Sequence, residues 1–208
     1  MKVVRKPSQS LESQVSSRIF GHGRGWVFTP RAFTALGDLG SVGMALTRLS
    51  RAGTIRQLAR GLYDYPIDHP TMGRIPPSSD AIAKALSARD AIRLQPAGAY
   101  AANLLGLSEQ VPTRIVFLTD GPSRRVKIGQ REIVLKGTTP RNMATAGRKS
   151  GTIIQALRHL GRPNVNEATI AILRRQLTDK DRAQLIKDLP YAPAWIAEVF
   201  RRLGAGSD

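Results

Sequence analysis

The feature that most constrains the fold is a break in hydrophobic periodicity across residues 65–79. Pro66, Pro70, Pro76 and Pro77 all lie within this short stretch. Proline fixes φ and lacks an amide hydrogen, so helices and central strands end where prolines gather. We therefore expect an extended connector over residues 67–79. It separates an N-terminal domain, residues 1–66, from a C-terminal domain, residues 80–208.

The N-terminal segment contains a series of short elements separated by glycines. Apolar residues at helical spacing, preceded by Ser or Thr as caps, predict three helices. A short strand falls between the first two, and a two-stranded hairpin follows the third. The expected elements are a helix over residues 10–20, a strand over 26–28, short helices over 29–37 and 41–53, and strands over 54–58 and 62–65. This order is typical of a winged helix-turn-helix DNA-binding domain.

The third of these helices is predicted to read DNA. Leu46 and Leu49 are expected to face the core, which leaves an opposite face of polar and basic residues. An arginine there can donate two hydrogen bonds to guanine or pair with a phosphate. Basic residues on the hairpin and at a helix start suit the DNA backbone. The residues expected to contact DNA are Thr29, Arg31, Ser41, Met44, Thr47, Arg48, Arg51, Arg56 and Arg60.

Simpler interpretations of the same residues remain open. A single exposed arginine is more often a solvated charge than a ligand. Met44 fits a partly buried position as well as a DNA contact. Trp26 fits a core aromatic of the short strand better than a platform on which a base stacks.

Charge points to a polyanionic partner in both segments. The chain of 208 residues has 32 Lys and Arg against 15 Asp and Glu, a net charge of +17. Residues 1–66 account for +7 of this charge and residues 67–208 for +10. Nucleic acid is the commonest partner of such a chain. Cysteine is absent, which excludes disulfides, thiol nucleophiles and Cys-ligated metals. With neither a signal peptide nor an apolar run of membrane-spanning length, we expect a cytoplasmic protein without membrane contact.

The C-terminal segment is predicted to mix strands and helices. Three strands, expected over residues 113–118, 125–128 and 132–135, are interpreted as a β-meander that forms a small antiparallel sheet. Helices are expected on either side of these strands, and four of them form the C-terminal part. The whole chain is therefore assigned to the α+β class. Basic residues line the second and third strands, where they suit either nucleic acid or an acidic protein: Arg124, Arg125, Lys127 and Arg131.

Catalytic patterns are scarce. The three histidines, His22, His69 and His159, lack metal-ligand spacing. The glycines of residues 21–25 precede a strand, the wrong order for a dinucleotide loop. Asp120 is interpreted as a turn residue. We expect no enzyme activity, no cofactor and no metal.

Several stretches of the chain resemble one known family. Residues 45–55 (ALTRLSRAGTI) and 60–66 (RGLYDYP) look like the winged-helix part of the AbiEi-type antitoxins. Similar likeness extends over residues 96–107 (PAGAYAANLLGL), 110–112 (QVP), 117–121 (FLTDG) and 155–158 (QALR). These proteins belong to abortive-infection, or type IV, toxin–antitoxin operons.

The resemblance implies a DNA-binding regulator. The N-terminal domain of such a protein binds inverted repeats upstream of its own operon and represses it. The C-terminal domain carries antitoxin activity against a nucleotidyltransferase-type toxin. The toxin is a functional partner, and the two proteins need not form a physical complex. The leading expectation is therefore a sequence-specific autorepressor and antitoxin without catalytic residues. The alternative is a protein-interaction module that neutralises the toxin directly, with DNA binding secondary.

Overall fold

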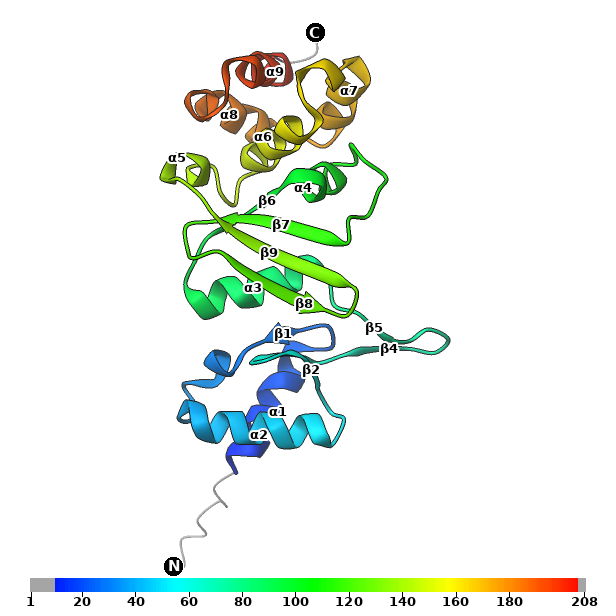
Figure 1. Cartoon of the computed structure of the whole chain (residues 1–208), viewed down its shortest axis with the longest axis vertical. Helices are drawn as coiled ribbons and strands as arrows, with labels where there is room; N and C mark the ends of the chain where they lie inside the picture. The colour runs from blue at the N-terminus through cyan, green and yellow to red at the C-terminus, as the bar shows by residue number, and fades with distance from the viewer. Residues whose placement is uncertain (1–9, 206–208) are drawn as a thin grey trace, which may run out of the picture. The chain divides into compact units, whose positions relative to one another are not determined.

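The computed structural model describes residues 10–205 and divides into two compact units. The first unit ends at Ala91 and the second begins at Ile92. Helices and small sheets occur in both units, and helices predominate at the C-terminal end (Figure 1). The expected α+β class is confirmed. Within residues 10–205, no helix has the length and apolar character needed to cross a membrane.

The first unit packs helices against a small antiparallel sheet. Strands β1, β3 and β2 are adjacent in that order, with Val27 opposite Asp64 and Gln57 opposite Tyr63. The elements in chain order are α1 (Leu11–His22), β1 (Val27–Phe28), the 3-10 turn η1 (Pro30–Phe33), α2 (Leu39–Arg51), β2 (Arg56–Ala59), β3 (Leu62–Asp64), β4 (Ile67–His69), β5 (Gly73–Ile75) and α3 (Ser79–Asp90).

The core of the first unit joins α1 and α2 to the sheet. Apolar residues at helical spacing point inward from each helix, as the sequence predicted. Phe28 and Phe33 pack edge to face between them, with ring centroids 5.4 Å apart. The buried residues of this core are Val15, Ile19, Phe28, Phe33, Val42, Leu46, Leu49, Ile55 and Tyr63.

The helix starts differ in part from those expected. Ser10 caps α1, since its hydroxyl accepts a hydrogen bond from the Ser13 N–H at 3.2 Å. Ser41 does not cap α2; Asp38 does, because its carboxylate accepts from the Ser41 N–H at 2.9 Å. Hydrogen bonds from Ser41, the side chain first and the backbone second, hold the pKa of Asp38 below its usual value. Thr29 makes no side-chain cap, and only a 3-10 turn follows it.

Residues 67–79 are not simply an extended connector. Strands β4 and β5 form a second hairpin, with Ile67 opposite Ile75 and His69 opposite Gly73. The first unit also continues through α3, whose residues contact β1. The compact unit is therefore longer than residues 1–66. Proline excludes central strands, but this hairpin is an isolated two-stranded ribbon in which Pro70 lies outside both strands.

The second unit is built from a sheet followed by a group of helices. Its elements are β6 (Leu94–Ala97), α4 (Gly98–Leu104), β7 (Arg114–Thr119), β8 (Arg124–Ile128), β9 (Arg131–Gly137), α5 (Pro140–Met143), α6 (Lys149–Leu160), the 3-10 turn η2 (Arg162–Asn164), α7 (Glu167–Arg175), α8 (Asp179–Lys187), the 3-10 turn η3 (Leu189–Tyr191) and α9 (Ala194–Gly204).

The sheet of the second unit is not a meander. Its strand order is β6-β7-β9-β8, so β9 lies between β7 and β8 and pairs with β7 in parallel. The expected hairpin of β8 and β9 is present, joined by Gly129 and Gln130, and φ at Gly129 is +58°. Strands β7 and β9 each bury consecutive apolar residues, whereas β8 alternates with exposed cations. Strands buried on both faces favour the centre, and charged strands favour the edge.

The helices of the second unit surround an apolar core and one buried carboxylate. Ile154, Leu157, Leu185 and Phe200 are among the residues buried between α6, α8 and α9. Asp188 is 1% exposed and accepts hydrogen bonds from Ser150, Arg148 and Gln184. These bonds join the start of α6 to the end of α8. A buried carboxylate needs such partners, because an unpaired charge there is strongly destabilising.

Candidate nucleic-acid interface

One face of α2 is buried and the opposite face is exposed. Val42, Ala45, Leu46 and Leu49 belong to the buried residues of the first unit. At about 100° per residue, positions 44, 47, 48 and 51 lie opposite these residues, within a stripe roughly 100° wide. All four side chains of this stripe are exposed, and we call it the α2 stripe: Met44, Thr47, Arg48 and Arg51.

The α2 stripe carries two cations in different surroundings. Arg48 Nη1 lies 3.0 Å from Glu12 Oε2 on α1, and both side chains remain partly exposed. Arg51 makes no ion pair with any of residues 10–205. Met44 is 57% exposed and borders a shallow groove of about 250 Å³ between α2 and the start of α1. Its exposure favours a surface role over the partly buried one.

A third exposed cation lies on the turn between β2 and β3. Arg60 and Gly61 form this turn, since Ala59 is paired with Leu62. Gly61 has a φ of +68°, which suits the second central position of a type II turn. Arg60 is exposed and makes no ion pair within the described residues. The hairpin thus presents a cation at its tip, as the sequence predicted.

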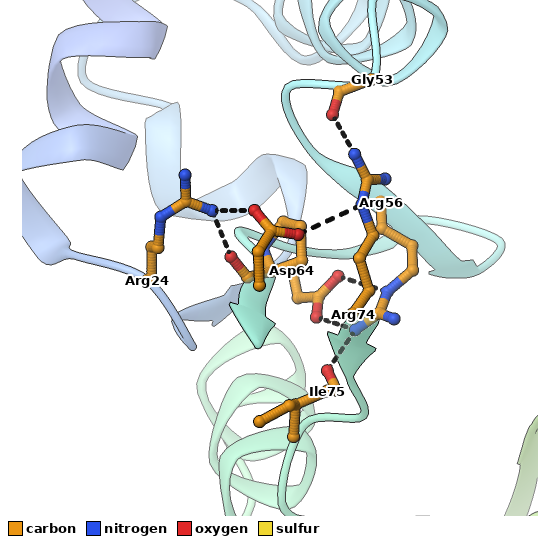
Figure 2. A network of polar contacts seen from close by, with 8 residues as sticks. Arg24, Gly53, Arg56, Asp64, Arg74 and Ile75 are labelled. Carbon is orange, nitrogen blue, oxygen red and sulfur yellow. Dashed lines mark hydrogen bonds and ion pairs between the residues drawn. The ribbon is translucent and has the colours of Figure 1, made fainter. Parts of the chain in front are cut away.

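Arg56, in contrast, belongs to an internal polar network (Figure 2). Its guanidinium donates two hydrogen bonds to Asp64, at 3.0 and 2.6 Å, and a third to the Ile75 carbonyl at 3.0 Å. Asp64 is 1% exposed. Both carboxylate oxygens of Asp64 therefore accept hydrogen bonds from Arg56. The Arg56 guanidinium stabilises the β2–β3 hairpin and does not project towards a binding partner.

The same region anchors the β4–β5 hairpin. Arg74 Nη2 donates to the Gly53 carbonyl at 2.9 Å, next to the end of α2 (Figure 2). Arg24 Nη1 donates to Asp68 at 2.6 Å and to the Pro66 carbonyl at 2.8 Å. No sequence pattern indicated a role for Arg24 or Arg74. Both are identified only by the chain segments that the fold brings together.

The other expected contacts lie away from the α2 stripe or are buried. Thr29 is 3% exposed, so its hydroxyl is not available at the surface. Arg31 is directed to α3, where Nη1 donates to the Arg89 carbonyl at 2.9 Å. Ser41 is partly exposed in the first turn of α2. Trp26 packs against Phe28 and Phe33, which agrees with its interpretation as a core aromatic.

The basic residues of the second unit divide between two faces of the sheet. Strand register places Arg125 and Lys127 on one face and Arg124 and Arg131 on the other. A groove of about 440 Å³ borders Arg125, and Arg114 and Lys136 also line it. Neither Arg114 nor Lys136 was predicted from sequence to belong to a basic surface. Their alignment with Arg125 depends on the parallel pairing of β7 with β9, which no local pattern predicts.

Titratable residues elsewhere are engaged in local structure. Asp120 accepts hydrogen bonds from the Arg93 backbone and side chain, both at 2.8 Å. The side-chain bond, followed by the backbone bond, holds the pKa of Asp120 below its usual value. This geometry fits a turn residue. Within residues 10–205, no group of three or more His, Asp or Glu side chains is placed to hold a metal ion.

Comparison with protein families gives a match over most of the chain. The model of a family of unknown function, DUF6088, matches residues 14–185, a range that begins within α1, ends within α8 and covers most of both units. A comparison with curated proteins gives no match. Evidence for function therefore comes from the chain's own residues.

Proposed function

The chain belongs to the DUF6088 family, and we propose that it binds double-stranded DNA in a sequence-specific manner through the first unit. The observation that carries this proposal is the α2 stripe. It combines two arginines, a threonine and an exposed methionine on the face opposite the buried one. An exposed helix of this composition has the dimensions and donors required in the major groove.

The proposed binding mode is that of a winged helix-turn-helix. Helix α2 lies in the major groove, where Arg48 and Arg51 donate to guanine or phosphate and Thr47 and Met44 contact base edges and thymine methyl groups. The β2–β3 hairpin is the wing, and Arg60 at its tip contacts the backbone or minor groove. Thr29 and Arg56 are left out of the interface because the first is buried and the second pairs with Asp64.

We propose further that the protein is a cytoplasmic autorepressor and the antitoxin of a toxin–antitoxin pair. The resemblance to AbiEi-type antitoxins supports this role, and the position of the α2 stripe is compatible with it. In this scheme two protomers, or two sites, read inverted repeats upstream of the operon. The toxin is of the nucleotidyltransferase type.

The test is binding to the DNA upstream of the protein's own reading frame. Fluorescence anisotropy with a labelled duplex, in a series of salt concentrations, measures both affinity and its salt dependence. We expect tighter binding to this duplex than to a shuffled one of the same composition. The log–log salt slope should be about −0.9 for each neutralised phosphate. Equal affinity for the native and shuffled duplexes contradicts sequence-specific binding.

A second candidate function is direct neutralisation of a toxin by the second unit. Its supporting observation is the sheet face on which Arg125, Lys127 and Lys136 make no ion pair with any of residues 10–205. Such a face suits an acidic protein surface by charge complementarity. Co-purification of the two proteins, lost on changing these residues to alanine, supports it. Rescue from toxicity without a stable complex argues against it.

A further inference from the structure

A cavity in the first unit lies between β1 and α3, and none of the α2 stripe residues lines it. Its volume is about 530 Å³, within the range of roughly 300–1,000 Å³ in which proteins bind small molecules. Trp26 and Phe28 contribute aromatic surface from the β1 side. Ala81, Ala85 and Ala88 contribute the opposing wall from α3.

The spacing of the alanines explains why this space is open. Ala81, Ala85 and Ala88 are four and three residues apart, so they lie on one side of α3. Methyl groups on that side do not fill the space beside the Trp26 indole. The indole itself is fixed, because it contacts Phe28 at a centroid distance of 4.6 Å and stacks on His22 at 3.8 Å. The cavity therefore has a rigid aromatic side and a smooth aliphatic side.

The lysine and arginine side chains that line the cavity are those of Arg31, Lys84 and Arg89. Lys84, on the same side of α3 as the alanines, lines the cavity and is exposed. Its ammonium group has no ion-pair or hydrogen-bond partner among residues 10–205. Arg31 also lines the cavity, and its bond to the Arg89 carbonyl fixes its guanidinium near α3. Among residues 10–205, no carboxylate lines the cavity, which accordingly favours an anion over a cation.

A hydrogen-bond donor completes the set. The indole N–H of Trp26 has no hydrogen-bond partner within the described part of the chain, although the ring is partly buried. The indole nitrogen is not among the buried side-chain atoms that lack a partner within residues 10–205, so solvent reaches it. It is therefore available to donate a hydrogen bond to an acceptor atom on a bound molecule.

We propose that this cavity is a binding site for a small planar aromatic anion. The ring packs between Trp26 and the alanines of α3, and a carboxylate, sulfonate or phosphate group pairs with Lys84 and Arg31. This inference goes beyond DNA binding and does not depend on it, since neither Trp26 nor Lys84 belongs to the α2 stripe.

The test uses two dyes that differ only in the anionic group. The first, 8-anilinonaphthalene-1-sulfonate, has a sulfonate on an aromatic frame, and the second, N-phenyl-1-naphthylamine, is the same frame without it. The chain has two tryptophans, so a Trp195→Phe background leaves Trp26 as the single donor of energy transfer. We expect saturable energy transfer from Trp26 to the sulfonate dye, and weaker binding of the neutral dye.

Two variants separate charge from shape. Lys84→Ala should lower the affinity for the sulfonate dye by about three- to tenfold, the range expected for loss of an exposed to partly desolvated ion pair. The neutral dye should be unaffected. Ala88→Leu, at an exposed position, should fill the cavity and lower the affinity for both dyes. Ala168→Leu, at an exposed position of α7 in the second unit, is the matched control and should change neither.

Three results overturn the proposal. The first is the absence of saturable energy transfer from Trp26. The second is an equal loss of affinity for both dyes in Lys84→Ala, which means that the charge of the dye is not recognised. The third is unchanged affinity for both dyes in Ala88→Leu with a native circular dichroism spectrum. Should that variant not fold, Ala81→Leu fills the same wall from the first turn of α3.

Discussion

Glu12 on α1 accepts a hydrogen bond from Arg48 on the α2 stripe, with 3.0 Å between Oε2 and Nη1. The two residues are 36 positions apart, and no acidic residue lies between Asp38 and Asp64. The exposed face of α2 therefore obtains its carboxylate from another helix. This contact holds one arginine of the proposed DNA surface and partly cancels its charge.

Removing the Glu12 charge should strengthen DNA binding. In Glu12→Gln, one more cation is available for a phosphate, so the log–log salt slope should steepen by about 0.9. Affinity for a shuffled duplex should rise more than affinity for the native one, because Arg48 is no longer held in one orientation. Anisotropy titrations measure both. Glu167→Gln, which removes the partner of Arg202 in the second unit, should leave the slope unchanged.

Loss of either arginine of the α2 stripe should weaken operator binding. Arg48→Ala and Arg51→Ala should each cost about 1–3 kcal/mol of binding free energy, the value of a bidentate base contact. The double variant should show no specific binding at physiological salt. Folding should persist, because both side chains are exposed.

The matched control for these variants is Arg175→Ala, which removes an exposed arginine at the end of α7. It should retain operator affinity. Native-like affinity in both Arg48→Ala and Arg51→Ala would show that α2 does not contact the operator.

Arg56 should matter for stability more than for DNA. Arg56→Ala leaves the Asp64 carboxylate, 1% exposed, without its guanidinium partner. Breaking a buried pair costs about 3–5 kcal/mol; because the Arg56 side chain is 26% exposed, we expect about 2–3 kcal/mol. Urea denaturation measures the change. Arg60→Ala, on the adjacent turn, should shift stability by less than about 0.5 kcal/mol, and an equal loss in both variants contradicts this distinction.

Acid should weaken the start of α8 through Asp181. The Thr178 N–H donates to Asp181 at 3.0 Å, and this bond, ahead of those from Thr178 Oγ1 and Lys149, lowers the pKa of Asp181. A carboxyl with a lowered folded pKa stabilises the fold above its unfolded value of about 3.9, and the contribution is lost as pH falls through the folded value.

The measurement is the free energy of unfolding between about pH 6 and about pH 2, a range that brackets the titration of a carboxyl group. The neutral variant Asp181→Asn should lose stability at pH 6 and show a flatter acid limb. Asp179→Asn changes a fully exposed carboxylate two residues earlier and should follow the wild-type profile. A wild-type profile in Asp181→Asn would exclude the charge of Asp181 as a stabilising factor.

Two helical glycines should respond in opposite ways to alanine. A Cβ at Gly43 on α2 meets nothing within 4 Å, so Gly43→Ala should stabilise the first unit by up to about 1 kcal/mol. A Cβ at Gly151 on α6 would overlap the Thr145 carbonyl and the Gln95 side chain. Gly151→Ala should cost about 1–3 kcal/mol, as overpacking does. Thermal denaturation checks both, and a change of the same sign in the two variants contradicts the packing argument.

Local patterns predicted the helices and hairpins well where a cap or a turn glycine was present. Thr178 and Asp181 form a capping box at the start of α8, and Gly129 lies in the turn that joins β8 to β9. Asp38 was missed as a cap because Ser41 offered an equally good local signal. Only the distance from Asp38 to the Ser41 N–H distinguishes them.

The candidate site was predictable in its helix but not in its neighbours. Helical periodicity alone separates the α2 stripe from Leu46 and Leu49, because the repeat of about 3.6 residues per turn determines which side chains share a face of the helix. Periodicity cannot show that Arg56 pairs with Asp64 or that Glu12 accepts a hydrogen bond from Arg48. It also cannot show that Arg31 donates a hydrogen bond to α3. Each of these contacts joins segments whose separation in sequence leaves no local signature.

The sequence by itself determined the α+β class, the basic character of both segments, most of the helices and the polar face of α2, because these follow from composition, caps and periodicity. The tertiary structure decided which cations are free and which are paired. It also placed β9 beside β7, extended the first unit through α3 and opened the cavity next to Trp26. The physical reason is that pairing, burial and cavities are set by atoms from distant parts of the chain, and only folding brings those atoms together.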